Sequence, residues 1–373
     1  MTNEEVVKIT SEKIVSHDEW RIAFKRYSDG INSNKNIYKE AASFLKKMLP
    51  SNMGTVRIYS SINVAQQPSV EYDLRIYGQS VGALVIKTKD KTRENKSYEL
   101  FLKIKKKHEE NNRKHLNLET KANPPRRPYN WNSEEAQIIF SSLINYNGKD
   151  AVMHSEEHKL ETLVLTDLAK KHKKSKKEGD KILTCIRPVM LGDVGFFQMR
   201  TPFKASKHSD KDYPKYSMSI KGAASGGGID ILARVQHKNK WRLAIIELKD
   251  ENNRSESQPI VLQQALVYAT FIAHLLRDKD CGDVWWNLFR NQDKDVLLDD
   301  QKDIAIDVVT MMPPIPCDKN GNPIYEECAM APISVPGIPN ITLYPSTIYI
   351  ETDDLKSKIT RTFGTLIDDK REI

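Results

Sequence analysis

Residues 226–249 read GGGIDILARVQHKNKWRLAIIELK, and this stretch predicts two strands joined by a short polar turn. The first strand, Ile229–Val235, directly follows three glycines, and the second is Trp241–Lys249. Because side chains alternate faces along a strand, Glu247 and Lys249 share one face of the second strand. Residues 243–248 are otherwise apolar on both faces, as in a central strand that is covered on both sides. A carboxylate placed there is costly unless it is paired or binds a cation.

Asp230 stands at the start of the first strand. If the two strands pair antiparallel, Asp230 comes close to the end of the second strand, so that Asp230, Glu247 and Lys249 converge. Two hard oxygen ligands beside an ammonium group suit Mg²⁺ or Mn²⁺. They also suit phosphodiester hydrolysis, in which the metal polarises a phosphoryl oxygen and acidifies a water while the lysine positions that water.

The flanking segments extend the pattern to the element order α-β-β-β-α-β. A helix is predicted from Ser155 to about residue 171, a strand over 196–203, and a last strand over Ile304–Thr310. Ser257 is placed to cap a long helix that reaches about Arg277, with a proline in its first turn. This order predicts an α/β fold with a central mixed sheet flanked by helices.

Asp230, followed by Glu247-Leu248-Lys249, resembles the D…(D/E)-x-K signature of the PD-(D/E)XK nuclease superfamily. The element order resembles the restriction-endonuclease-like core of that superfamily. Gln264-Ala-Leu-Val-Tyr268 is similar to the Q-x-x-x-Y motif of its RecB-type branch, and residues at i and i+4 share a helix face, so both can point into one site. The resemblance covers about residues 151–312. The proline that usually precedes the aspartate in this family is absent, and Ile229 stands in its place.

The resemblance implies a metal-dependent nuclease in which a metal-activated water attacks the phosphodiester in line. It assigns Asp230 and Glu247 to the binding of Mg²⁺ or Mn²⁺ and Lys249 to the orientation of the attacking water. The family takes a further acidic ligand from the preceding helix, where Glu157 and Glu161 are candidates and Glu161 fits the family pattern better. The glutamine and tyrosine of the Q-x-x-x-Y motif would support the site or touch the phosphate.

Each of these residues also has a purely structural interpretation. Glu247 and Lys249 could form a mutual ion pair at a strand end, and Asp230 could be a turn aspartate after flexible glycines. Gln264 and Tyr268 could be polar tips on an amphipathic helix. Their coincidence within one ordered core favours the functional interpretation.

The composition is that of an ordinary soluble protein, with 373 residues, 39% hydrophobic and 29% charged. The best apolar run, Ile260–Leu276, is shorter than the roughly 20 residues that cross a bilayer, and the polar, acidic N-terminus is unlike a secretory signal. The four cysteines include no C-x-x-C pair, which argues against a zinc ribbon or an iron–sulfur cluster and fits a reducing cytoplasm. The P-loop and dinucleotide-binding motifs are absent from the sequence.

The length predicts two domains. Residues 1–125 are interpreted as an α+β domain, with a helix over 18–50 that breaks at Ser28–Gly30 and four strands between residues 56 and 104. Residues 131–373 are interpreted as the nuclease-like domain, and the Pro/Arg stretch 124–128 as the boundary. Residues 313–345 hold 8 of the 17 prolines and are predicted to be an irregular extension.

The net charge of +8 is concentrated in two segments. Residues 81–130 carry 14 Lys and Arg against 6 Asp and Glu, and residues 169–181 carry seven Lys against two acids. Local basic segments attract polyanions, so we expect the N-terminal domain to supply nucleic-acid binding. The alternative is a pair of solvated loops that keep the protein soluble.

The expected function is therefore metal-dependent hydrolysis of DNA, in bacterial genome defence or DNA repair, in the cytoplasm and without a membrane partner. Duplex cleavage by one site per subunit implies a homodimer or a larger complex. One alternative is a DNA-binding protein on the same scaffold that does not cleave, or that acts only with a partner subunit. Another is a glycoside hydrolase with paired carboxylates, against which Lys249 and the basic segments argue.

Overall fold

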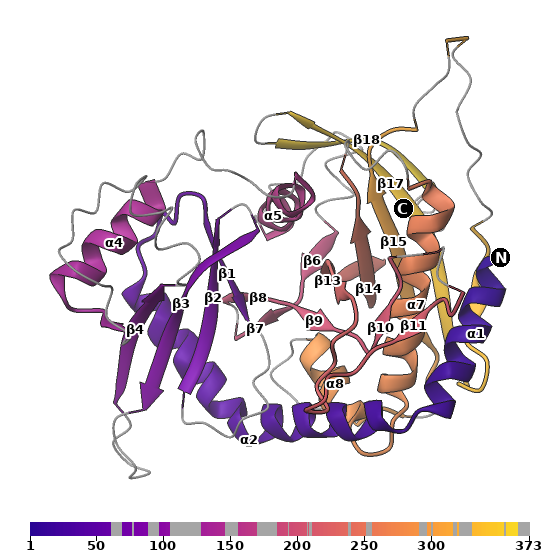
Figure 1. The fold of residues 1–373 in the computed structure, drawn as a ribbon, viewed down its shortest axis with the longest axis horizontal. Helices are drawn as coiled ribbons and strands as arrows, with labels where there is room; N and C mark the ends of the chain where they lie inside the picture. The colour runs from indigo at the N-terminus through magenta and orange to yellow at the C-terminus, as the bar shows by residue number, and fades with distance from the viewer. Residues whose placement is uncertain are drawn as a thin grey trace. The chain divides into compact units, whose positions relative to one another are not determined.

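The computed structural model of this chain describes all residues except 61–68, 77, 89–96, 105–127, 146–155, 170–184, 193, 207, 209–210, 238–239, 251–255, 291–296, 300, 316–318, 321–329, 354–355 and 365–373. Helices and mixed sheets confirm the α/β class (Figure 1). The chain divides into two compact units. Unit 1 comprises Met1–Asp29, Leu163–Val189 and Gln198–Ile373, and unit 2 comprises Gly30–Thr162 and Met190–Phe197.

Unit 2 is built on one sheet with the strand order β5-β4-β3-β2-β1-β8-β7. All neighbouring pairs are antiparallel except β1 and β8, which are parallel. The strands are β1 (Val56–Ser60), β2 (Ser69–Ile76), β3 (Gln79–Thr88), β4 (Tyr98–Ile104), β5 (Tyr129–Asn130), β7 (Met190–Leu191) and β8 (Gly195–Phe197). The unit also holds α4 (Glu134–Asn145), and its first four strands confirm those predicted between residues 56 and 104.

Unit 1 is built on a mixed sheet with the strand order β16-β17-β15-β14-β13-β6, and β18 pairs with β17. β14, β15 and β17 run parallel, and β13 runs antiparallel to both β6 and β14. The strands are β6 (Ile186–Pro188), β13 (Ile231–His237), β14 (Lys240–Leu248), β15 (Ile304–Met312), β16 (Ile333–Ser334), β17 (Ile341–Asp353) and β18 (Lys356–Gly364). The expected antiparallel pairing of β13 with β14 is confirmed, and Ile231 lies opposite Ile246.

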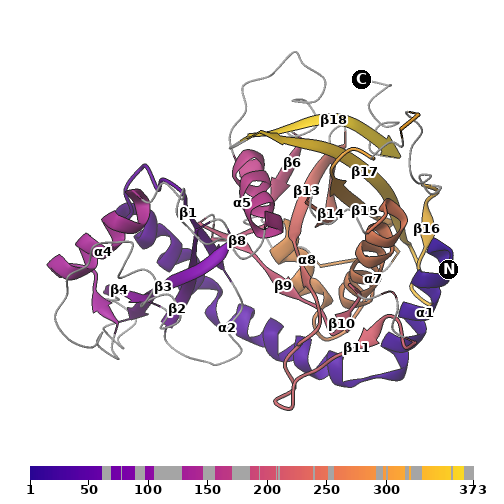
Figure 2. The same ribbon diagram turned by 45° about the horizontal axis from the view of Figure 1, so that its top comes forward.

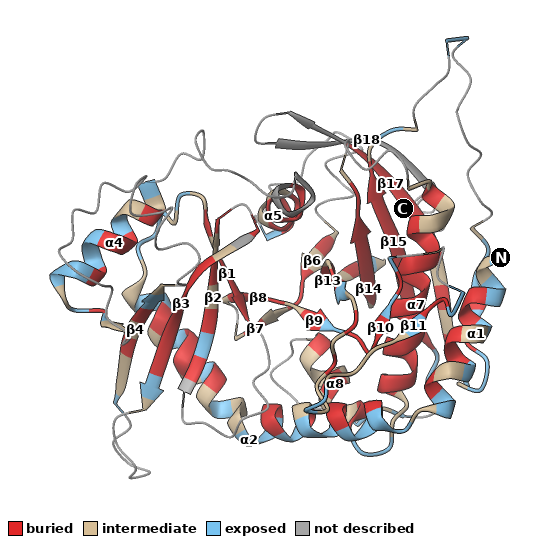
Figure 3. Ribbon diagram, viewed as in Figure 1, coloured by how far each residue is buried: buried red, intermediate tan, exposed pale blue. Residues whose placement is uncertain are grey.

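The core of unit 1 lies between this sheet and α7 (Gln258–Leu276), which packs on β14, β15 and β17 (Figures 1 and 2). α7 begins after Ser257, as predicted, and nearly every residue in it is buried (Figure 3). By length and composition alone, α7 could span a membrane, but 89% of its most apolar window is buried inside the protein. Such burial is that of the core helix of a folded domain.

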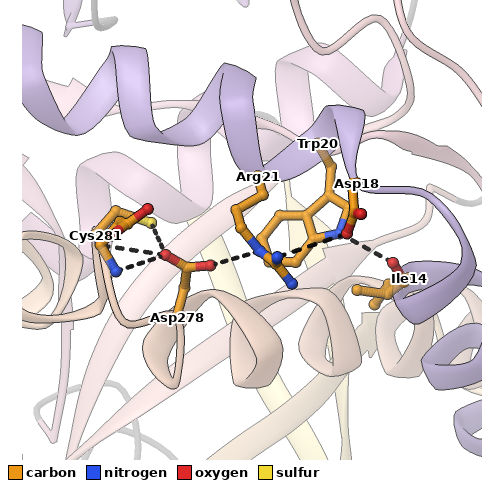
Figure 4. Close-up of polar contacts among 7 residues, drawn as sticks. Ile14, Asp18, Trp20, Arg21, Asp278 and Cys281 are labelled. Atoms are coloured by element: carbon orange, nitrogen blue, oxygen red, sulfur yellow. Dashed lines mark hydrogen bonds and ion pairs between the residues drawn. The ribbon is translucent and has the colours of Figure 1, made fainter.

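The N-terminal helices α1 (Asn3–Ser16) and α2 (Glu19–Met48) anchor to α7 and to the turn before α8 (Gly282–Arg290). The carboxylate of Asp278 in that turn pairs with Arg21 Nε at 3.1 Å and accepts a hydrogen bond from the Cys281 thiol (Figure 4). The indole N–H of Trp20 donates to the carbonyl of Ile14. Burial and the neighbouring Asp278 raise the pKa of Cys281, so this thiol stays protonated.

Two local predictions are wrong. α2 continues through Ser28–Gly30, because a mid-helix glycine costs only about 1 kcal/mol and the buried face of α2, including Phe24, outweighs that cost. Residues 196–203 form parts of β8, β9 (Met199–Arg200) and β10 (Phe203–Lys204) instead of one strand. Pro202 lacks the N–H that a continuous ladder would use.

The Pro-rich extension is also more regular than predicted. It contains β16 and the first part of β17, although residues 316–318 and 321–329 lie outside the described ones. Pro345 lies in β17 between Leu343, which pairs with β16, and Ser346, which pairs with β18. Its missing N–H therefore removes no ladder bond on that edge.

The compact units follow a different division from the predicted boundary at residues 124–128. The chain passes between the units within α2, within α5 (Glu156–Ala169) and on either side of β7 and β8. The N-terminal residues 1–29 belong to the same unit as the core sheet, because α1 covers α7. Most of the Pro/Arg stretch lies outside the described residues.

Candidate active site

Asp230 stands immediately before β13 and reaches the end of β14. Its Oδ2 accepts a hydrogen bond from the backbone N–H of Leu248 at 2.9 Å, in continuation of the β13–β14 pairing. On the other side of β14, Lys249 N–H donates to Met311 of β15. The side chain of Asp230 is thereby placed at the Glu247-Leu248-Lys249 segment, as the antiparallel pairing predicts.

Glu247 and Lys249 are both buried, and they form an ion pair with 3.7 Å between Glu247 Oε1 and Lys249 Nζ. Lys249 Nζ also lies 3.5 Å from Oε2 of Glu256. Glu256 was not among the predicted site residues, although it directly precedes the capping residue of α7. One ammonium therefore stands between two carboxylates, of which only Glu256 is partly exposed.

α7 contributes Gln264 and Tyr268 to the same place. Gln264 Nε2 donates to Glu247 Oε1 at 2.5 Å, and both side chains are buried. Burial raises the pKa of Tyr268, and the negative charges of Glu247 and Asp230 raise it further. The Tyr268 hydroxyl therefore stays protonated and can donate a hydrogen bond. The predicted i, i+4 pair of this helix thus lies at Glu247.

Tyr213 and His208, which no sequence pattern predicted, come from the segment between β10 and β11 (Lys215–Tyr216). Tyr213 is buried, and burial together with the charge of Glu247 raises the pKa of its hydroxyl. That hydroxyl has no hydrogen-bond partner among the described residues. His208 stacks on Tyr213 with 4.0 Å between ring centroids, and burial lowers the pKa of His208. Neither residue stands in a motif, so only the folded chain reveals them.

A row of buried polar side chains extends the site across the sheet. Glu247 is in register with Thr310 of β15, and Thr310 is in register with Thr347 of β17. The two threonine hydroxyls are hydrogen-bonded at 2.8 Å, and Gln258 of α7 donates to Thr347 at 2.9 Å. All three residues are fully buried. This face of the sheet is therefore polar beneath α7 along one register row.

The predicted helix acid, Glu161, belongs to a different compact unit from the other predicted site residues. Glu161 lies on α5, is buried and belongs to unit 2, whereas Asp230, Glu247 and Lys249 belong to unit 1. Within unit 2, burial and then the charge of Glu161 raise the pKa of Tyr59. The side chain of Glu157 lies outside the described ones. The assignment of a metal ligand to this helix stays a prediction.

The donor groups at the end of β14 fit a hard divalent cation by their chemistry. They are the carboxylates of Asp230, Glu247 and Glu256 and the amide oxygen of Gln264, which is buried without a hydrogen-bond partner among the described residues. Within that part of the chain, no group of three or more His, Cys, Asp or Glu side chains is placed to hold a metal. Mg²⁺ is usually bound by one or two carboxylates and keeps several waters, so two carboxylates are compatible with its chemistry, and the assignment of Asp230 and Glu247 as its ligands stays a prediction.

Replacing Gly227 with Ala should lower the free energy of unfolding by about 1–3 kcal/mol. A Cβ at Gly227 would lie 1.8 Å from the hydroxyl oxygen of the buried Tyr268, so the ring must move. Gly228→Ala is the matched control, because the nearest atom to its Cβ is 4.0 Å away. Chemical denaturation of both variants measures the difference. Tyr268→Phe should recover part of the loss in Gly227→Ala, and equal stability of the two alanine variants would contradict the packing.

In comparisons with known proteins, no family model, curated protein or solved structure matches this chain.

Proposed function

We propose that this protein is a metal-dependent nuclease that hydrolyses phosphodiester bonds of DNA, on a restriction-endonuclease-like core of the PD-(D/E)XK superfamily. The observation that carries the proposal is the gathering of Asp230, Glu247 and Lys249 at one end of the β13–β14 pair. Support comes from Gln264, which hydrogen-bonds Glu247, and from Tyr268. The order of α5, β13, β14, α7 and β15 is compatible with the family core.

In the proposed mechanism, Asp230 and Glu247 would hold Mg²⁺ or Mn²⁺. The bound ion would polarise a phosphoryl oxygen and lower the pKa of a water. Lys249 orients the attacking water and offsets the negative charge that develops on the phosphate. Gln264 fixes the carboxylate of Glu247 through its hydrogen bond. The protonated hydroxyl of Tyr268 is available to donate to a phosphate oxygen.

A second candidate is a protein on the same scaffold that binds DNA without cleaving it, or cleaves only with a partner subunit. One observation favours it: the described residues include no three-ligand metal cluster. A binder's affinity should follow the salt concentration and largely ignore the divalent ion. Under either proposal the protein acts in the cytoplasm on nucleic acid.

The deciding experiment incubates the full chain with supercoiled plasmid and with linear single strands, each with Mg²⁺, Mn²⁺, Ca²⁺ or EDTA. We expect nicked or shortened DNA with Mg²⁺ or Mn²⁺ and intact DNA with EDTA. Glu247→Gln keeps the shape of the side chain and serves as the inactive control. Intact DNA in every metal, together with salt-dependent DNA binding, would establish the second candidate instead.

Tyr213→Phe should raise stability and lower cleavage at the same time. An unsatisfied buried hydroxyl costs about 1–3 kcal/mol, so its removal should raise the melting temperature. If the hydroxyl donates to the substrate beside Glu247, cleavage should fall by about tenfold. Tyr72→Phe is the matched control, because that buried hydroxyl also has no partner among the described residues and lies in unit 2. If Tyr213→Phe cleaves DNA at the wild-type rate, the hydroxyl of Tyr213 takes no part in cleavage.

A further inference from the structure

Two exposed lysines face each other on the short ribbon that lies in the chain before Asp230. β10 and β11 pair antiparallel, and Lys204 is the direct register partner of Lys215. Both side chains are exposed. Like charges directly opposite each other on a ribbon are destabilising. The ribbon therefore concentrates positive charge that a bound polyanion would neutralise.

The ribbon continues into an ordered loop, residues 217–225. Ser219 N–H donates to Ala223 O at 2.8 Å, and Gly222, with φ +72°, donates to Ser219 O at 2.8 Å. Ala224 N–H donates to the hydroxyl of Tyr27 on α2 at 3.3 Å. Figure 2 shows this loop projecting past α2. The backbone bonds and the brace on α2 hold the loop in one conformation, so its tip is presented in a defined way.

The tip of the loop carries a fully exposed Ile220, followed by an exposed Lys221. Ile220 is the most exposed of the large hydrophobic residues that the structure describes, at 108% of its reference area. The Arg26 guanidinium adjoins the loop, because a Cβ at Gly222 would lie 3.6 Å from its Nη1. An apolar tip flanked by Lys221 and Arg26 resembles the arrangement of proteins that insert a side chain between base steps.

The loop leads directly into the candidate active site. After the loop, Gly226 and Gly227 hydrogen-bond back to Thr201 and Phe203, and β12 (Gly228–Ile229) pairs with β9. Asp230 follows β12 at once. The ribbon and loop that would bind the duplex therefore lead straight into Asp230, one of the proposed metal ligands.

We propose that the ribbon β10–β11 and loop 217–225 form a docking surface for duplex DNA. Lys204, Lys215 and Lys221 contact phosphates, and Ile220 inserts as a wedge that unstacks a base step. The identity of the polyanion rests on the proposed function. The insertion is a step beyond it, because cleavage chemistry alone requires no wedge. The cost of unstacking is offset by the additional contacts of the bent duplex.

The test measures binding of the full chain to a 30-bp duplex that carries 2-aminopurine at several positions, in EDTA so that no cleavage occurs. We expect 2-aminopurine fluorescence to rise on binding. Ile220→Ala should lose that rise and bind about tenfold more weakly, with an unchanged salt slope. Leu297→Ala is the matched control, since Leu297 is also a highly exposed apolar side chain of unit 1. Lys204→Gln/Lys215→Gln should flatten the slope of log K against log salt by about two, whereas the charge-matched Lys279→Gln/Lys302→Gln should not.

Two results would overturn the inference. One is a wild-type protein that binds the duplex without any rise in 2-aminopurine fluorescence. The other is binding to phosphatidylglycerol vesicles that depends on Ile220, with no binding to the duplex, which would make the loop a membrane contact. Failure of the nuclease proposal is distinguishable, because it would leave duplex binding and the fluorescence rise intact while DNA survives in Mg²⁺ and Mn²⁺.

Discussion

Replacing Lys249 with Met should lower DNA cleavage by about two orders of magnitude or more, as for the loss of other transition-state contacts. Methionine keeps most of the length of the side chain and removes its charge. Lys249 is only 5% exposed. Its Nζ lies 3.7 Å from Oε1 of Glu247 and 3.5 Å from Oε2 of Glu256, so the substitution removes a buried positive charge from between two carboxylates. Single-turnover cleavage of a labelled duplex measures the loss.

The same substitution should also destabilise the fold, because it leaves two carboxylates without their common cation. Mg²⁺ should then raise the melting temperature of Lys249→Met more than that of the wild type, since the ion replaces the missing charge. Lys279→Met, which removes an exposed lysine of the same unit, should change neither quantity. A folded Lys249→Met protein that cleaves at the wild-type rate would show that the match to E-x-K is accidental.

Acidification from pH 6.5 to pH 4 should cost the protein up to about 3 kcal/mol of stability through His274 alone. His274 lies on α7, is 6% exposed, and burial lowers its pKa to about 4. Its Nε2 lies 2.6 Å from the hydroxyl of Ser11 on α1, and that hydroxyl donates to the carbonyl of Pro336. Because the serine proton is already used, the neutral imidazole donates from Nε2.

The loss of stability on acidification follows from the lowered pKa of His274. Between pH 4 and 6.5 the unfolded chain binds a proton at His274 and the folded chain does not, so stability rises with pH across this window. The contribution of neutral His274 to the free energy of unfolding is complete above pH 6.5 and is lost as the pH falls toward 4. Urea denaturation at pH 7, 5.5 and 4.5 measures it. His274→Gln should flatten the profile. An unchanged profile in His274→Gln would contradict the assignment.

Short-range sequence signals were enough to predict the local elements of the core. Alternation over residues 229–249 predicted the β13–β14 pair, and the cap at Ser257 predicted the start of α7. These signals are short-range: the alternation of side chains along a strand and the first turn of a helix depend only on neighbouring residues. The same reasoning placed Asp230 at the end of β14, because an antiparallel hairpin fixes which residues meet.

Which distant residues share the site became visible only in the folded chain. Sheet register and the packing of α7 bring side chains from separate segments to the surroundings of Glu247. They are Glu256, Tyr213 and the Thr310–Thr347 pair. The tertiary structure also assigned α1 to the core unit and β8 to the other sheet, where local signals predicted an N-terminal domain and one long strand. The reason is physical: burial and register are settled by contacts between residues far apart in the chain, and the periodicity of a single segment does not specify its partner.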